Sequence, residues 1–168
     1  VGLRVLLPGG FSSIRWFGRG PHENYPDRKA STVVTRHASS VAEQLTPYIR
    51  PGECGGKADV RWLEVSRPAQ NRVPAAAAAD AAAAAAPASS SAQADSSPSL
   101  FSFSALPHLA EDLAGAMHPE QLPPRPVTAV SLDHRIMGVG GDDSWSACVH
   151  DEYLVRPGRF RFSFALAP

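Results

Sequence analysis

Short segments of alternating apolar and polar residues, separated by glycine- and proline-rich turns, direct this chain toward an all-β fold. The clearest alternation runs over 160–166, and a second runs over 100–104. Successive side chains on a strand point to opposite faces, so each segment predicts a strand with one buried face. Four further strands are expected at 3–7, 13–17, 59–65 and 127–133, and 32–37 is interpreted as a strand or an extended loop.

A single segment has the spacing of a helix. Leu109, Leu113 and Met117 recur every four residues, which predicts one short amphipathic helix over 109–117 with its apolar stripe in a core. Strands and helices do not alternate, so a βαβ nucleotide-binding fold is excluded. The sequence therefore predicts an antiparallel β-sandwich with one short helix. Within 59–65 the alternation slips at Trp62 and Leu63, which indicates a β-bulge.

A compositionally biased stretch divides the chain. From 74 to 99 nearly every residue is Ala, Ser or Pro, and no large apolar side chain is available for burial. We expect a disordered insertion there, because nothing offsets the entropy lost on ordering; a surface helix over 75–86 is the alternative. The expected organisation is one β-sandwich domain in two parts, 1–73 and 100–168, on either side of the insertion 74–99.

Charge and cysteine content exclude several classes of function. The chain has 168 residues with 16 basic and 16 acidic side chains and no basic run, so neither nucleic acid nor a membrane is expected as a partner. The alanine-rich run is far shorter than the roughly 20 apolar residues that span a bilayer. Cys54 and Cys148 lack metal-binding spacing, and we expect two free thiols in a reducing compartment.

Two turn-rich blocks are the candidate functional segments. Block 1, Trp16–Lys29, concentrates aromatic, glycine, proline and charged residues, and block 2, Met137–Trp145, places three glycines before two acids and an indole. Block 2 is not a phosphate loop, because it departs from G-x-G-x-x-G and has no lysine. Asp142 and Asp143 are neighbours whose side chains diverge, so loop hydrogen bonding is expected rather than a metal site or a catalytic pair. The Trp145 indole suits stacking on a sugar, with a core position as the alternative.

Block 1 also contains two carboxylates, Glu23 and Asp27. Glycoside hydrolysis needs two carboxyl groups a few ångströms apart, and this spacing does not show that geometry. Three basic residues lie near them in the sequence: Arg19, Arg28 and Lys29. Salt-bridged loop scaffolding is therefore expected. The pair of His22 and Glu23 would be needed for mutarotase-like catalysis, but adjacency in sequence does not indicate convergence on a sugar. The six histidines have no zinc-binding spacing, and no metal site is expected.

Four stretches, in this order and at this approximate spacing, resemble the C-terminal β-sandwich domain of the large family 2 β-galactosidases. They are Trp16–Arg28, Tyr48–Glu53 with Asp59–Trp62, Glu111–Leu113, and Met137–Trp145. In two-chain forms of these enzymes the domain is the small chain. The resemblance implies a galactose mutarotase-like supersandwich of which this chain is a part. The sequence departs from the family at Cys54, where asparagine is usual.

The same resemblance implies a part in hydrolysing terminal non-reducing β-D-galactose residues of β-galactosides such as lactose, with retention. In that family the two catalytic glutamates and the Mg²⁺ ligands lie on a separate TIM barrel, with Na⁺ as a second cation. No catalytic residue and no cofactor are therefore expected in this chain, which alone is expected to be inactive. One role transfers, to Trp145 as part of the galactoside-binding platform. Four residues would position its loop: Gly141, Asp142, Asp143 and Ser144.

The resemblance also sets the expected partners. They are the β-galactoside and the rest of the β-galactosidase chain or its large subunit, in an oligomer and in the cytoplasm. The chain begins Val1-Gly2-Leu3 without an initiator methionine, and we interpret it as the C-terminal part of a longer protein. The alternative function is a non-catalytic module for carbohydrate binding or assembly.

Overall fold

The computed structural model describes residues 1–68, 100–146 and 148–167. The expected insertion at 74–99 and the boundary at residue 73 lie outside the described residues. The strands are β1 Gly2–Pro8, β2 Ser13–Gly20, β3 Val33–Ser40, β4 Lys57–Val60, β5 Trp62–Ser66, β6 Phe101–Leu106 and β7 Val127–Asp133. The helix is α1 Ala110–Gly115, and the short 3-10 turns are Ala42–Gln44, Pro119–Gln121 and Asp151–Tyr153.

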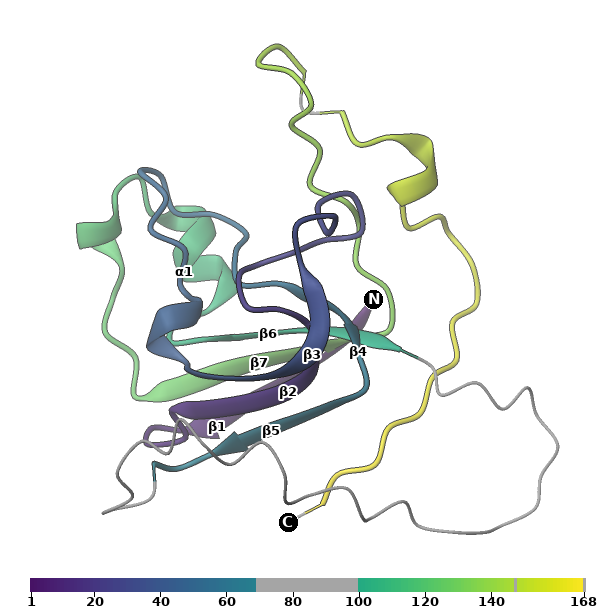
Figure 1. Ribbon diagram of the computed structural model, residues 1–168. Coiled ribbons are helices and arrows are strands. Elements are labelled where there is room, and N and C mark those ends of the chain that lie inside the picture. The colour runs from purple at the N-terminus through teal and green to yellow at the C-terminus, as the bar shows by residue number, and fades with distance from the viewer. Residues whose placement is uncertain (69–99, 147, 168) are drawn as a thin grey trace, which may run out of the picture.

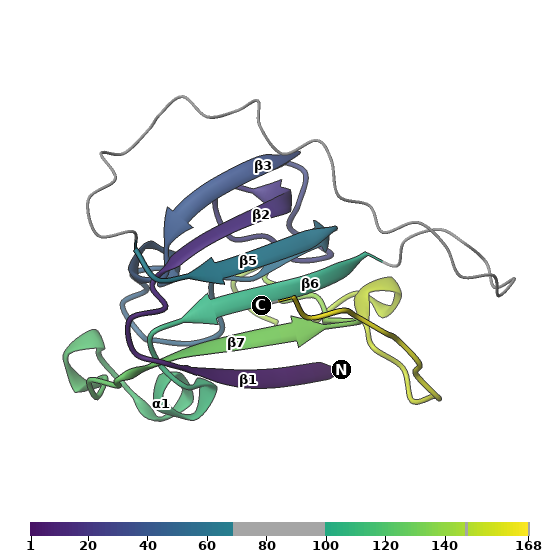
Figure 2. The same ribbon diagram turned by 90° about the horizontal axis from the view of Figure 1, so that it is seen from below.

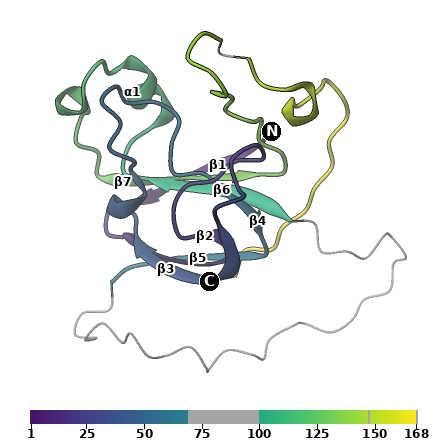
Figure 3. The ribbon, with the colours of Figure 1, turned by 45° about the horizontal axis from the view of Figure 1, so that its top comes forward.

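The strands form two antiparallel sheets that lie face to face (Figure 1, Figure 3). One sheet has the order β1-β7-β6-β4 and the other β3-β2-β5. Figure 2 shows the two sets of strands from below. The central strand β2 pairs on both sides, with Trp16 opposite His37 of β3 and Leu63 of β5. The antiparallel β-sandwich with one short helix, predicted from alternation, is confirmed.

The main core lies between the two sheets. Its buried residues are Ile14, Trp16, Val41, Val60, Phe103, Ala105 and Val130. The Trp16 indole meets the Phe103 ring edge-on, with centroids 5.8 Å apart. Fully burying such large apolar side chains is the dominant stabilising contribution in a small sandwich. Block 1 begins inside this core, because Trp16 and Gly18 belong to β2.

The single strand expected over 59–65 is wrong. The chain forms β4 up to Val60 in one sheet and β5 from Trp62 in the other, so this segment crosses from one layer to the next. The change of direction falls at Asp59, whose φ is +53°, and at Arg61, whose N–H donates to the carbonyl of Phe17 at 2.8 Å. A corner between sheets therefore replaces the bulge expected at Trp62 and Leu63.

The alternating segment 160–166 is not a strand, which corrects the clearest expectation from the sequence. Phe162 stacks on His134 with centroids 5.3 Å apart, while Phe164 and Leu166 are exposed. Alternation specifies which face side chains would take, but a strand also needs a neighbour for its backbone hydrogen bonds. The helix is likewise shorter than expected: Leu113 is buried in a second small core, and Met117 is exposed.

Candidate functional site

Block 1 is folded against β4 and the turn before it. The Asn24 side chain accepts the N–H of Ala58 at 2.7 Å, and its own backbone N–H donates to Gly56 at 2.8 Å. Tyr25 is 2% exposed and lies so close to Gly56 that a methyl group there would be 2.6 Å from the ring. These contacts hold the block in one conformation.

Glu23 ties block 1 to the 46–55 segment. Its carboxylate accepts hydrogen bonds from Thr46 Oγ1 at 2.8 Å, from the Gly55 N–H at 3.0 Å and from the Tyr48 hydroxyl. Burial raises the pKa of Glu23, but these donors outweigh it and hold the pKa below its usual value. Glu23 thus acts here as an ionised hydrogen-bond acceptor for the loop.

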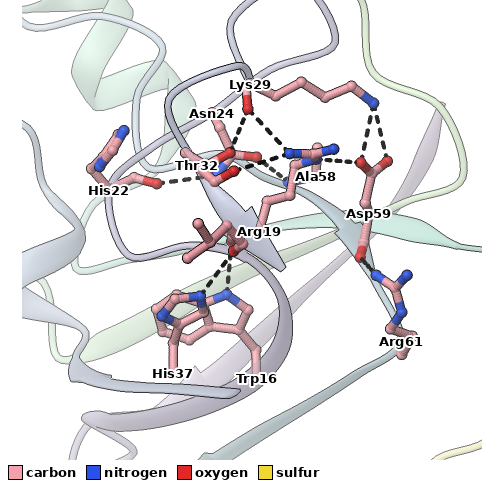
Figure 4. Close-up of polar contacts among 11 residues, drawn as sticks. Trp16, Arg19, His22, Asn24, Lys29, Thr32, His37, Ala58, Asp59 and Arg61 are labelled. Carbon is pink, nitrogen blue, oxygen red and sulfur yellow. Dashed lines mark hydrogen bonds and ion pairs between the residues drawn. The ribbon is translucent and has the colours of Figure 1, made fainter. Parts of the chain in front are cut away.

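Salt bridges in block 1 involve a different acid from those expected. Arg19 Nε donates to Asp59 Oδ2 at 2.5 Å, and Lys29 Nζ donates to both Asp59 oxygens at 3.1 and 3.2 Å (Figure 4). The expected pairing of Arg19 and Lys29 with Glu23 and Asp27 is therefore wrong. Arg28 acts on Glu23 only through its charge, which helps lower the Glu23 pKa.

Asp27 joins the two blocks. Tyr25 and Arg28 form an antiparallel bridge, which places Pro26 and Asp27 at the tip of a tight turn. Asp27 Oδ2 accepts the N–H of Gly140 at 2.7 Å, across 113 residues of sequence. The other carboxylate oxygen is buried and has no hydrogen-bond partner within 1–68, 100–146 and 148–167. The structure therefore brings Asp27, rather than the pair of Glu23 and Asp27, to the candidate loop.

Block 2 projects away from both sheets as a loop (Figure 1, Figure 3). Gly140 and Gly141 have φ values of +65° and +88°, where residues with a Cβ are strained. Asp143 Oδ1 accepts the N–H groups of Trp145 and Ser146, both at 2.7 Å, and these bonds lower the Asp143 pKa. Asp142 contacts His150 Nε2, which raises the His150 pKa. Both aspartates thus make the loop hydrogen bonds expected of them.

Trp145 lies in this loop and is 94% exposed, so the core position considered as its alternative is wrong. Two cavities, of about 250 and 220 Å³, border the sheet with β6 and β7, and Trp145 lines neither of them. An exposed indole on a loop with fixed hydrogen bonds can offer a flat apolar face to a ring, a role that suits sugar recognition or a contact with another protein surface.

Three further features concern metals, membranes and thiols. Within the described ranges, His, Cys, Asp and Glu side chains do not gather in any group of three or more that could bind a metal. In the same part of the chain, each helix is too short or too polar to cross a bilayer. Both cysteines are free: Cys54 is buried and Cys148 is exposed.

Comparison with known proteins identifies the family. The family model described as the β-galactosidase small chain matches residues 1–166. The chain belongs to the β-galactosidase small-chain family. The β-galactosidases of Priestia megaterium, Psychromonas ingrahamii and Vibrio cholerae are similar to it, at 36%, 35% and 36% identity over 169, 167 and 166 residues. Those alignments include 99% or 100% of this chain but only 14% of each relative, so the small chain spans 14% of their length.

Several connections within this small chain have no signal in the sequence. The contact between Asp27 and Gly140 joins two blocks that each stand out on their own, but nothing in either block specifies the pairing. His150 was one of six scattered histidines, and Asp142 lies eight residues before it. Ser144 makes no described side-chain hydrogen bond, so its role in positioning the loop stays a prediction, as does the role of Gly141.

Proposed function

We propose that this small-chain domain completes a β-galactosidase that hydrolyses terminal non-reducing β-D-galactose residues of β-galactosides such as lactose. In this proposal the two catalytic glutamates lie on a TIM barrel in the rest of the enzyme, and the mechanism is retaining. We likewise assign Mg²⁺ and Na⁺ to that part of the enzyme. The partners are then the β-galactoside and the remaining chain or large subunit, in a cytoplasmic oligomer.

The observation that supports this proposal is the exposed Trp145 on its hydrogen-bonded loop. A side chain of this size is 94% exposed although apolar residues are usually covered. Its backbone N–H is fixed by Asp143, so the position of the residue does not depend on packing of the ring. When the domain joins the barrel, the indole would stack on the galactoside, and Gly141, Asp142, Asp143 and Ser144 would hold the loop around it.

Kinetics of the complete enzyme test this role. Trp145→Ala should raise KM for a chromogenic β-galactoside roughly 10-fold or more, because a large aromatic contact with the sugar is lost. Trp145→Phe should recover part of that loss. The matched control is Val33→Ala, which removes an exposed apolar side chain from β3 (61% exposed) and should leave both constants unchanged. Unaltered KM in Trp145→Ala would rule out the platform role and favour a module that serves assembly only.

A further inference from the structure

Asp27 is held firmly enough to serve as an anchor for block 2. The turn that presents it is closed by hydrogen bonds between Tyr25 and Arg28, at 2.9 and 3.3 Å. Tyr25 itself is buried against Gly56, next to the first residue of β4. The Asp27 carboxylate therefore extends from a part of the molecule that is attached to the sandwich, while block 2 extends away from it.

The glycines of block 2 fit around this carboxylate. A Cβ on Gly138 would lie 2.5 Å from Asp27 Oδ2, so only glycine permits the observed approach. The Gly138 N–H donates to the carbonyl of Tyr153 at 3.0 Å, and the Gly140 N–H donates to Asp27. A Cβ on Gly140 would lie 2.7 Å from the carbonyl of Cys148. The base of the loop is thus shaped for contact with Asp27.

The environment of Asp27 differs from that of a carboxylate serving stability alone. Two cations of block 1, Arg19 and Lys29, are bound to Asp59 rather than to Asp27. One Asp27 oxygen is buried without a partner among the described residues, which is unfavourable. The other accepts the backbone N–H of Gly140, and hydrogen bonds from an N–H to a carboxylate are strong and directional. This combination fixes the position of the Gly140 backbone at some cost in stability.

The path from Gly140 to the indole is short and constrained. Gly140 and Gly141 have left-handed backbone conformations, Asp142 contacts His150, and Asp143 accepts the N–H of Trp145. These contacts link the backbone at Gly140 to that of Trp145, five residues later. In a binding site, misplacement by about 1 Å can cost roughly 100-fold in rate.

We propose that Asp27 is a positioning residue that sets where Trp145 meets the sugar, by holding the Gly140 N–H at the base of the loop. This inference rests on the proposed function of Trp145. It assigns Asp27 no contact with substrate and no part in proton transfer.

The test uses the complete enzyme with Asp27→Ala, which removes the acceptor, and Asp27→Asn, which keeps a carbonyl oxygen for Gly140. Asp27→Ala should raise KM for a chromogenic β-galactoside roughly 10-fold with a smaller change in kcat, and Asp27→Asn should stay near the parent enzyme. In the Trp145→Ala background, Asp27→Ala should have no further effect on KM, since it acts through the missing ring. The control is Asp151→Ala, which removes an acid paired with Arg156 on the surface, both more than 60% exposed, and should change nothing.

Hydrogen exchange of the 137–146 amides is measured on the same variants and does not depend on activity. Asp27→Ala should speed exchange of the Gly140 amide, and Asp27→Asn should retain most of its protection.

Unchanged exchange of the Gly140 amide in Asp27→Ala overturns the proposal. So does faster exchange with KM unaltered, if Trp145→Ala still raises KM. If Trp145→Ala itself leaves KM unaltered, the proposed role of Trp145 fails and the positioning role of Asp27 fails with it, whatever the exchange data show. Effects on KM that add independently in the double variant also overturn the proposal.

Discussion

The ammonium group of Lys57 lies 5.6 Å from the centroid of the Trp16 indole, inside the protein. Lys57 is 1% exposed, and its Nζ donates a hydrogen bond to the carbonyl of Gly55 at 3.1 Å. Burial lowers the Lys57 pKa to about 8, and the negative charge of Glu23 opposes this shift only in part. Burial of the Lys57 charge is thus unfavourable at neutral pH, although the indole face attracts the cation.

Stability should therefore depend on Lys57 in alkaline solution. The unfolded lysine keeps its proton up to about pH 10.5 whereas the native one loses it near 8, so the free energy of unfolding should rise with pH in that window. Below it, both states are protonated and burial of the charge costs about 3 kcal/mol. We predict that Lys57→Met raises the free energy of unfolding by about 1–3 kcal/mol at pH 7 and abolishes its rise with pH. Urea denaturation at several pH values measures the free energy of unfolding and its dependence on pH. Arg15→Met, which alters an exposed ion pair with Glu64, is the control; a less stable Lys57→Met protein would refute the prediction.

Asp59 provides a second prediction, in which the stability from a charged group is lost in acid solution. Although burial raises its pKa, hydrogen bonds from Arg19 and Lys29 prevail and hold the native pKa below the unfolded value. Its stabilisation is therefore complete above the unfolded pKa near 4 and is lost as pH falls through the native pKa. Asparagine can adopt the positive φ of Asp59, so Asp59→Asn removes the charge without straining the backbone. This variant should lower the free energy of unfolding by about 1–3 kcal/mol at pH 7.

Thermal or urea unfolding of Asp59→Asn should approach that of the parent as the pH falls below 4. The control, Glu64→Gln, removes the acid of an exposed pair whose two side chains are both 49% exposed, and should change stability by less than about 0.5 kcal/mol. A constant difference between parent and Asp59→Asn at all pH values would show that charge plays no part.

Close approach of Tyr25 to the backbone makes Gly56 a sensitive position. An added methyl group would lie 2.6 Å from the ring, which must move within a packed region. We predict that Gly56→Ala lowers the free energy of unfolding by about 1–3 kcal/mol. At Gly158 a methyl group would meet nothing within 4 Å, so Gly158→Ala should be neutral within about 0.5 kcal/mol. Equal stability of the two variants in denaturant titration would contradict this packing.

Local sequence was sufficient for most of the sheet. The segments 3–7, 13–17 and 127–133 lie within strands of the structure, and the segment 100–104 lies within β6 apart from Leu100, because each contains its own alternation. It was insufficient where the outcome depends on a partner distant in sequence. Segment 160–166 has the alternation without a neighbouring strand, and Arg19 pairs with Asp59, 40 residues away, rather than with the acids beside it. The contact of Asp27 with Gly140 and the burial of Lys57 also depend on partners distant in sequence, so local sequence did not predict them.

The central claim is that this domain completes a β-galactosidase whose catalytic groups lie elsewhere. The most direct measurement is hydrolysis of a chromogenic β-galactoside by this chain alone, by the rest of the enzyme alone, and by the two together. We predict activity only in the mixture, with a higher KM when this chain contains Trp145→Ala. Activity of this chain alone would contradict the claim and make Glu23 and Asp27 the first carboxylates to replace. Full activity of the rest of the enzyme without this chain would contradict it equally.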